Sequence, residues 1–274
     1  MAKLLFVIIA FLTASVCSAA TEKNHNLVII DSHIHYSHDA WEEFPPKEAL
    51  KILQESGLKK AFVSSSSDEG TQKLYSLAPD FIVPVLRPYR ERGETFSWKS
   101  DESVIGMLSN LLKQNTYLGI GEFHAFGKDM ELPVLKSVIA LAKQYGIFLH
   151  AHSDAEAVEG IFTENPKAIV LWAHAGFTNT EEIRSMLKKH PNLWADLAYR
   201  EDYAYGSKVN EEWRQLFTEF PDRFMLGTDT YTPERWYYVN YHHKWSREWL
   251  SDLPKPLAEN IAYRNAERLL AKVK

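Results

Sequence analysis

The stretch Leu27-Val28-Ile29-Ile30-Asp31-Ser32-His33-Ile34-His35 joins a short apolar run to two histidines that are two positions apart. An apolar run of this length predicts a buried β-strand. Side chains alternate along a strand, so His33 and His35 would point to the same side. Two imidazoles on one face can bind one metal ion. For an isolated pair the alternative is two surface histidines in a loop, so the rest of the chain has to decide.

Strand-like and helix-like segments alternate along the chain. The predicted strands are 27–30, 60–63, 81–86, 117–122, 147–152, 168–174, 193–196 and 224–228. The predicted helices are 46–55, 70–77, 101–113, 132–145, 155–164, 180–189, 210–219 and 257–271. The strands are mostly apolar throughout, as parallel strands covered on both faces are, and the strict alternation predicts a single α/β domain, a (β/α)8 barrel of the TIM type. A doubly wound open sheet is the alternative, but no Gly-rich phosphate-binding turn follows the first predicted strand.

Length and charge narrow the class of protein. The chain has 274 residues, of which 45% are hydrophobic, and barrels of this type commonly use about 250 residues as one domain. The net charge of -5 gives no reason to expect a nucleic acid partner. We therefore assign residues 21–274 to one barrel domain that acts on a small molecule, and homo-oligomer formation stays open.

The first twenty residues differ from the rest. A short positive start, Met1-Ala2-Lys3, precedes an apolar stretch at 4–16, and the small residues Ala19 and Ala20 follow. This pattern predicts a signal peptide over residues 1–20, and hence an exported protein, periplasmic or secreted, without a stable membrane anchor after cleavage. An uncleaved anchor is the alternative. Cleavage would also remove Cys17, which is the single cysteine, so the mature chain would need no disulfide.

One long irregular segment is expected at 231–255, between the eighth predicted strand and the last predicted helix. It is rich in aromatic residues, among them Trp236, Tyr241 and Trp245. Long loops in compact domains are usually functional, so we interpret it as an active-site loop. Packing on the outer helices, or an oligomer interface, is the alternative.

Polar side chains recur where the predicted strands end. They are His33 and His35, Glu122, His150 and His152, His174, Asp196 with Arg200 beyond it, and Asp229. Barrel active sites form at this rim from the ends of several strands. Imidazole nitrogen and carboxylate oxygen suit Zn²⁺, Mn²⁺, Fe²⁺ or Ni²⁺. The pattern predicts a divalent metal site in which a metal-activated water is the nucleophile.

These residues lie in motifs that resemble the signatures of the amidohydrolase superfamily. The motifs are Asp31-Ser32-His33-Ile34-His35, Gly121-Glu122, His152-Ser153-Asp154, Ala173-His174-Ala175-Gly176 and Gly227-Thr228-Asp229-Thr230. The chain is most similar to the amidohydrolase-related (amidohydrolase-2) metal-dependent hydrolases. The resemblance covers nearly the whole mature chain, and the combination of motifs is specific although each motif alone is weak.

The resemblance implies a role for each residue. His33 and His35 would bind the more buried metal ion, and His152 and His174 would be further ligands. Asp229 would contact the metal, act as general base toward the bound water and later return the proton to the leaving group. His174 and Asp229 together would form the catalytic part of the site.

Glu122 departs from the pattern of many binuclear relatives, which have a carbamylated lysine at the fourth strand. TatD-like relatives have a glutamate there, so Glu122 could be a ligand, a bridge between two ions, or a hydrogen-bond partner of a histidine. The number of metal ions, one or two, therefore stays open, with zinc as the first choice and manganese, iron or nickel as alternatives.

Three residues are further candidates for binding substrate. Arg87 and Arg200 could hold a carboxylate or phosphate through paired hydrogen bonds. His150 shares a face with His152 and could also support the site from behind. The predicted activity is hydrolysis of an amide, lactone or other ester bond. The alternatives are a metal-dependent decarboxylase or hydratase of a carboxylated substrate, a TatD-like phosphoesterase or nuclease, and a barrel that only binds a ligand.

Overall fold

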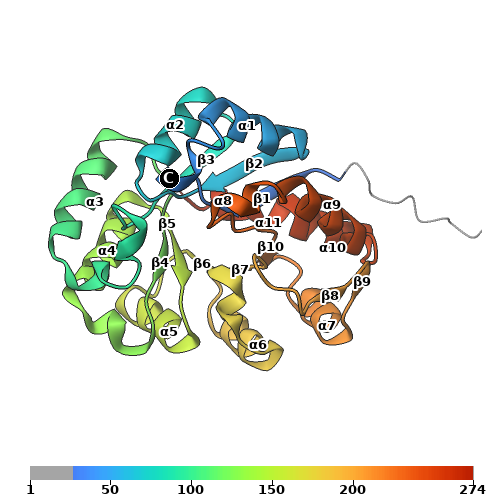
Figure 1. Cartoon of the computed structure of the whole chain (residues 1–274). Helices are drawn as coiled ribbons and strands as arrows, with labels where there is room; N and C mark the ends of the chain where they lie inside the picture. Colours follow the sequence, from blue (N-terminus) through green and yellow to red (C-terminus); the bar gives the residue numbers. More distant parts are fainter. Residues whose placement is uncertain (1–26, 274) are drawn as a thin grey trace, which may run out of the picture.

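The protein forms a barrel of eight parallel strands surrounded by helices (Figure 1). The computed structural model describes residues 27–273. The barrel strands, which neighbour one another in chain order, are β1 (Ile29–Ile34), β2 (Leu58–Val63), β3 (Ile82–Leu86), β4 (Gly119–His124), β5 (Phe148–His152), β6 (Val170–Trp172), β7 (Leu193–Asp196) and β10 (Phe224–Met225). The predicted (β/α)8 architecture is confirmed. The predicted signal peptide, residues 1–20, lies outside the described residues.

Hydrogen bonds between β1 and the segment that begins with β10 close the barrel. The backbone N–H of Ser32 donates to the carbonyl of Leu226 at 2.8 Å, and the N–H of Asp229 donates to the carbonyl of His33 at 2.7 Å. This closure places the eighth strand's polar end directly beside the histidines of the first strand.

The buried carboxylate of Asp31 adds further hydrogen bonds to this junction between β1 and the segment that begins with β10, which we call the seam. Its Oδ1 accepts the backbone N–H groups of His33 at 2.9 Å and Thr228 at 3.2 Å. Its Oδ2 accepts the hydroxyl of Thr228 at 2.8 Å and lies 2.8 Å from Nε2 of His243. All three partners are buried, so the carboxylate exchanges solvation by water for solvation by fixed protein donors.

Seven helices connect the strands in the predicted order. They are α1 (Pro46–Glu55), α2 (Glu69–Leu77), α3 (Ser103–Gln114), α4 (Pro133–Tyr145), α5 (Ala155–Glu164), α6 (Thr180–Lys189) and α7 (Glu211–Glu219). Local signals set their ends. The Asn179 side chain caps α6 by accepting the N–H of Glu182, and Gly146 ends α4 in the left-handed conformation.

The segment expected to be an irregular loop, 231–255, is instead largely helical, so that prediction was wrong. It contains α8 (Pro233–Trp236) and α9 (Val239–Leu250). Val239, His243, Ser246 and Trp249 are buried at helical spacing, which is the pattern of a helix packed on one side. The exposed Tyr241 and the tyrosines just before the helix, Tyr237 and Tyr238, obscured that spacing in the sequence. A short hairpin of β8 (Ala204–Tyr205) and β9 (Lys208–Val209) was also not predicted.

The C-terminal segment is made of helices, the last of which packs against the end of the barrel opposite the rim. They are α10 (Lys255–Glu259), a π-helical turn (Asn260–Arg264) and α11 (Asn265–Leu270). Ala266 and Leu269 of α11 pack with side chains from seven of the strands, including Phe62, Phe148 and Trp194, in a cluster separate from the larger outer core. This cluster fills the barrel interior, which leaves the polar residues to the carboxyl ends of the strands. None of the helices in residues 27–273 combines the length and apolarity that crossing a membrane requires.

Gly227 tests how tightly the seam is packed. A Cβ atom there would lie 2.7 Å from Cβ of His33 and 2.9 Å from Cβ of Ala198. We predict that Gly227→Ala lowers the free energy of unfolding by about 1–3 kcal/mol, because the strands must separate to admit the methyl group. In the control, Gly106→Ala in α3, the new Cβ meets nothing within 4 Å and should raise stability by about 0.5–1 kcal/mol. Denaturation in urea measures both; an unchanged Gly227→Ala variant would contradict this packing.

Asp68, at the start of α2, gives a pH-dependent prediction. Burial raises the pKa of its carboxyl from 3.8 to about 6, although the hydroxyl of Tyr117 donates to it at 2.5 Å. Because the folded-state pKa lies above the unfolded one, this stabilising contribution is complete in acid and is lost as the pH rises through about 6. The shift corresponds to roughly 3 kcal/mol. Between pH 4 and pH 8, we expect wild type to lose stability relative to Asp68→Asn, so the variant's unfolding free energy rises relative to that of wild type. The exposed Asp80→Asn control should show no such trend.

Candidate metal centre

The six residues predicted as metal ligands meet at the carboxyl ends of the strands. His33 and His35 come from the end of β1, Glu122 from β4 and His152 from β5, while His174 and Asp229 follow β6 and β10. They lie in or directly beneath a cavity of about 290 Å³. Its lining is Ser66, Arg87, Arg92, Thr95, Glu122, His124, His152, His174, Phe177, Tyr199, Asp229 and Tyr231.

Distances between the donor atoms are short. Nε2 of His33 lies 3.1 Å from Nε2 of His35 and 3.5 Å from Oε1 of Glu122. Oδ1 of Asp229 lies 3.4 Å from Nε2 of His35 and 3.8 Å from Nε2 of His33. Nε2 of His174 lies 3.3 Å from Oε1 of Glu122. The donors therefore form overlapping groups: His33, His35 and Glu122 offer ligand atoms within 4.8 Å of one another, and so do His33, His174 and Asp229.

Hydrogen bonds at the other ring nitrogen orient these histidines. Nδ1 of His35 lies 2.8 Å from the carbonyl of Ser64, and Nδ1 of His174 lies 2.8 Å from the carbonyl of Ala198. A carbonyl only accepts, so Nδ1 carries the hydrogen and Nε2 of the neutral ring presents its lone pair to the cluster. Nδ1 of His33 faces Oδ2 of Asp196 at 3.2 Å and serves the same purpose.

Asp196 is a fully buried carboxylate behind the cluster. Its Oδ1 accepts the backbone N–H groups of His174 and Ala198, both at 3.0 Å, while its Oδ2 contacts His33 and lies 2.9 Å from Nε2 of His150. The four contacts hold the segments after β6 and β7 against the end of β1. Asp196 and His150 thus lie beneath the cavity and not in its lining.

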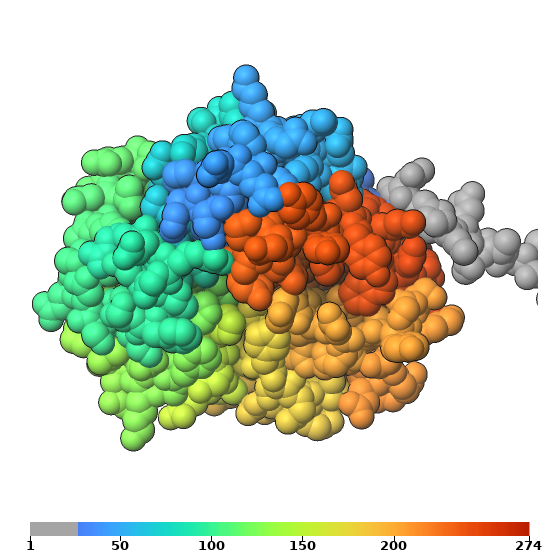
Figure 2. All heavy atoms as spheres, in the orientation of Figure 1, coloured from blue at the N-terminus to red at the C-terminus, as the bar shows by residue number. Residues whose placement is uncertain are grey.

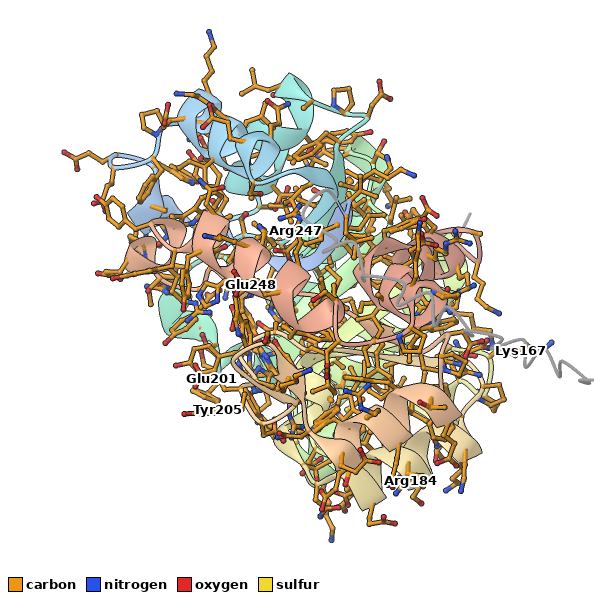
Figure 3. The ribbon with its side chains drawn as sticks, turned by 90° about the vertical axis from the view of Figure 1, so that its right-hand side faces the viewer. Lys167, Arg184, Glu201, Tyr205, Arg247 and Glu248 are labelled. Carbon is orange, nitrogen blue, oxygen red and sulfur yellow. The ribbon has the colours of Figure 1, made fainter. Side chains whose placement is uncertain are left out.

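The two arginine candidates differ in position. Arg87 lines the cavity and donates from Nη2 to Oε2 of Glu122 at 2.9 Å. Arg200 pairs with Asp202 at 2.6 Å and donates to the carbonyl of Thr178 at 2.9 Å. It lines a neighbouring cavity of about 320 Å³, together with Glu201 and Tyr205, which are labelled in Figure 3.

The charges of the cluster are mutually dependent. Burial opposes the charged form of His33, but the carboxylates of Asp196, Asp229 and Glu122 outweigh burial and raise its pKa well above the usual range. Burial alone would raise the pKa of Glu122, but His33 and the hydrogen bonds from neighbouring histidines bring it well below the usual range. Burial, and then the charge of Arg87, lower the pKa of His35 to about 4, so its lone pair is free at neutral pH.

Two observations test whether these residues fit a divalent cation. Oδ1 of Asp229 is buried and has no hydrogen-bond partner among the described residues, although a buried polar atom normally has one. The Nε2 atoms of His33 and His35 face one another at 3.1 Å, an arrangement that a proton or a metal ion between the lone pairs stabilises. The mixed nitrogen and oxygen donors are those that divalent transition metals prefer. The residues fit such an ion.

The backbone is unusual at two of these positions. His174 and Asp229 both have φ of 56°, in the left-handed region that L-residues rarely adopt. Such conformations persist where the surroundings fix them, and they concentrate at functional sites. Asp229 is fixed by its own N–H, which donates to His33, and by Arg235, which donates to its carbonyl.

Comparison with known proteins identifies the family of this chain. The family model described as amidohydrolase matches residues 119–272, which contain Glu122, His152, His174 and Asp229. The chain belongs to the amidohydrolase family. It is accordingly an enzyme of the amidohydrolase type, a metal-binding hydrolase. No significant match was found among curated proteins.

Three solved structures have a similar fold. A proposed 2-pyrone-4,6-dicarboxylic acid hydrolase from Pseudomonas putida is 13% identical, with 90% of this chain and 98% of that chain covered and a TM-score of 0.62. An amidohydrolase from Burkholderia multivorans is 12% identical, with 89% and 99% covered and a TM-score of 0.54. A TatD family hydrolase from Entamoeba histolytica is 12% identical, with 89% and 98% covered and a TM-score of 0.54. At these sequence identities, the similarity between this chain and the three structures is a similarity of fold.

Sequence reasoning missed several residues of the site. Arg92 and Phe177 line the cavity, but each lies several residues beyond the end of its strand, where the sequence has no motif that indicates a site residue. Asp196 was noted at the rim, but its position behind His33 depends on contacts across the barrel. His243, which contacts Asp31, lies in the segment that we expected to be irregular.

We predict that the double variant His33→Ala/His35→Ala no longer retains a metal ion, because it lacks the two most buried nitrogen donors. Metal analysis of the purified protein after dialysis measures this, with circular dichroism to verify the fold. The control is His38→Ala, since His38 is exposed and lies outside the cluster. Full metal occupancy in the double variant would refute the site.

Proposed function

We propose that this amidohydrolase cleaves a lactone, another ester or an amide bond in a small molecule. The observation that carries the proposal is the convergence of imidazole and carboxylate donors at the base of a cavity of about 290 Å³. Cavities near this size accommodate small ligands.

Zinc is the metal that we propose, held by His33, His35, His174 and Asp229, with Glu122 and His152 beside them. A bound divalent ion of this kind lowers the pKa of water toward neutrality and so supplies a nucleophile. Both carboxylate oxygens of Glu122 already have partners: Oε2 accepts from Arg87 at 2.9 Å and lies 3.3 Å from Nε2 of His35, and Oε1 lies 2.8 Å from Nδ1 of His152. We propose a single ion, with Glu122 as a hydrogen-bond partner of the neighbouring side chains and not as a bridge between two ions.

Asp229 is the general base of the proposed reaction. Its Oδ1 faces the histidine cluster without a hydrogen-bond partner among residues 27–273, so it can accept a proton from water and later donate it to the leaving group. Its backbone is anchored on both sides, which holds the carboxylate in place during the transfer.

The cavity walls indicate the substrate class. Arg87 and Arg92 supply guanidinium N–H donors beside their ion pairs with Glu122 and Asp39, and Phe177, Tyr199 and Tyr231 supply aromatic faces. These groups suit a flat molecule with a carboxylate. The Pseudomonas protein of similar fold is a proposed hydrolase of 2-pyrone-4,6-dicarboxylic acid, a cyclic ester with two carboxyl groups, which supports a lactone as the first class to test.

The same arginines favour a second candidate, metal-dependent decarboxylation or hydration of a carboxylated substrate, which would use the same metal ligands. Release of CO₂ separates decarboxylation from hydrolysis. A TatD-like nuclease is the weaker alternative, because the cavity is small and the net charge of -5 repels a polyanion.

Export is part of the proposal. The apolar stretch at 4–16 and the small residues at 19 and 20 support cleavage of a signal peptide and a periplasmic or secreted mature protein of residues 21–274. Mass determination of the protein recovered from outside the cytoplasm tests this; an intact Met1 in that fraction would refute cleavage.

The activity is tested with the zinc-loaded protein on δ-valerolactone, 4-nitrophenyl acetate and an N-acetyl amino acid, with CO₂ release measured in parallel for carboxylated compounds. We expect Asp229→Asn to lower kcat/KM by about 10²–10⁴. Its folded structure should remain, because the backbone contacts of Asp229 do not involve the side chain. The exposed Asp222→Asn variant is the control. Wild-type activity in Asp229→Asn would exclude this residue as the base.

A further inference from the structure

His124, the last residue of β4, is not used by the proposed mechanism although it lines the cavity. Its ring stacks on that of His152 at a centroid distance of 4.0 Å, and it lies two positions beyond Glu122 on the same strand. Glu122, His124 and His152 offer ligand atoms within 4.8 Å of one another, so proximity alone would suggest a second metal site.

The hydrogen bonds of Tyr89 argue against that role. The hydroxyl oxygen of Tyr89 accepts the backbone N–H of His124 at 2.6 Å and lies 2.8 Å from Nδ1 of the same residue. Tyr89 is 1% exposed, so water does not reach the hydroxyl. Among the described residues, Nδ1 of His124 is the acceptor in reach of its hydrogen. Tyr89 therefore donates and Nδ1 accepts.

This contact determines the tautomer. A neutral imidazole has one N–H and one lone pair, so a ring that accepts at Nδ1 carries its hydrogen on Nε2. His35 and His174 have the opposite arrangement, because carbonyl groups fix their hydrogens on Nδ1. His124 thus presents an N–H donor where those two histidines present lone pairs.

His124 is also held rigidly. Its backbone N–H donates to Tyr89 and its carbonyl accepts from Nε1 of Trp98 at 3.3 Å. The rings of Tyr89 and Trp98 pack against one another at 5.9 Å. With His152 on its face, the imidazole of His124 is fixed at the backbone, at Nδ1 and at the ring. Nε2 has no hydrogen-bond partner among residues 27–273, and the side chain is partly exposed.

We propose that His124 is a catalytic residue that donates a hydrogen bond from Nε2–H to the oxygen of the substrate's reacting carbonyl group. It keeps its proton throughout, so no bond to hydrogen is broken at this residue. The negative charge on that oxygen grows as water attacks, and a donor already in position stabilises it without reorganisation. The inference rests on the proposed hydrolytic function.

The tautomer is tested first, without any substrate. Protein labelled with ¹⁵N-histidine is examined by ¹H–¹⁵N NMR, before and after loading with zinc. We expect the His124 signals to show a protonated Nε2 and an unprotonated Nδ1 in both samples, and Tyr89→Phe to remove this preference. A hydrogen on Nδ1, or loss of the Nε2 hydrogen on adding zinc, would overturn the proposal.

The catalytic role is tested by variants of the zinc-loaded enzyme on δ-valerolactone. His124→Leu should lower kcat/KM by about 10²–10³, the usual effect of removing one such donor. The metal content and KM should change little. His124→Gln, which retains an N–H donor, should recover part of the rate. His242→Leu, outside the first cavity, is the matched control. Lost zinc or full activity in His124→Leu would overturn the proposal.

A final measurement separates this proposal from the proposed function. Methylphosphonate, a tetrahedral anion, is added to the zinc-loaded labelled protein. We expect the Nε2–H signal of His124 to shift in wild type. The shift should be absent in Tyr89→Phe, in which His124 no longer prefers the hydrogen on Nε2. If wild type fails to hydrolyse lactones, esters and amides, the proposed function fails while this shift still supports the donor; an unmoved signal overturns the donor itself.

Discussion

The carboxylate of Asp31 joins the first strand of the barrel to the segment that follows the last one, and the site depends on that junction. One oxygen accepts two backbone N–H groups, from His33 and Thr228, and the other accepts the Thr228 hydroxyl. Because Asp229 is the next residue, the proposed general base and the first proposed metal-binding histidine are placed by the same hydrogen bonds. Residues almost two hundred positions apart thereby become neighbours whose separation is set by main-chain geometry.

Within that frame, the partner at Nδ1 decides what each histidine can do. A carbonyl at Nδ1 directs a lone pair into the cluster, as for His35 and His174. A hydroxyl that must donate directs an N–H there, as Tyr89 does for His124. One residue type thus supplies both kinds of group within the same cavity. The selection is made by buried atoms that touch neither metal nor substrate.

Much of the fold and of the candidate site can be predicted from the sequence. The alternation of apolar strands and helices determines the barrel, and the ends of its strands identify His33, His35, Glu122, His152, His174 and Asp229 as neighbours, because parallel strands expose their carboxyl ends on one rim. Local patterns did not reveal α9, since the exposed aromatic residues Tyr237, Tyr238 and Tyr241 lie before and within it. They also could not give the roles of Asp196 and His124, which depend on contacts with distant strands. Tyr89, for example, is 35 positions from His124.

Helix α9 is attached to the seam through His243, and neighbouring rim segments pack beside it. Figure 2 shows the segment around α8 against the chain that follows β1, where Phe44 stacks on Trp236 at 6.0 Å. Half of the residues that line the cavity come from other loops, those after β3, β6 and β7. An engineer seeking a new specificity could exchange the parts of these loops that lie beyond Arg87 and His174. Replacing α9 would remove His243 from Asp31 and leave a buried carboxylate one hydrogen bond short, so this part of the rim belongs to the scaffold and is unsuitable for grafting.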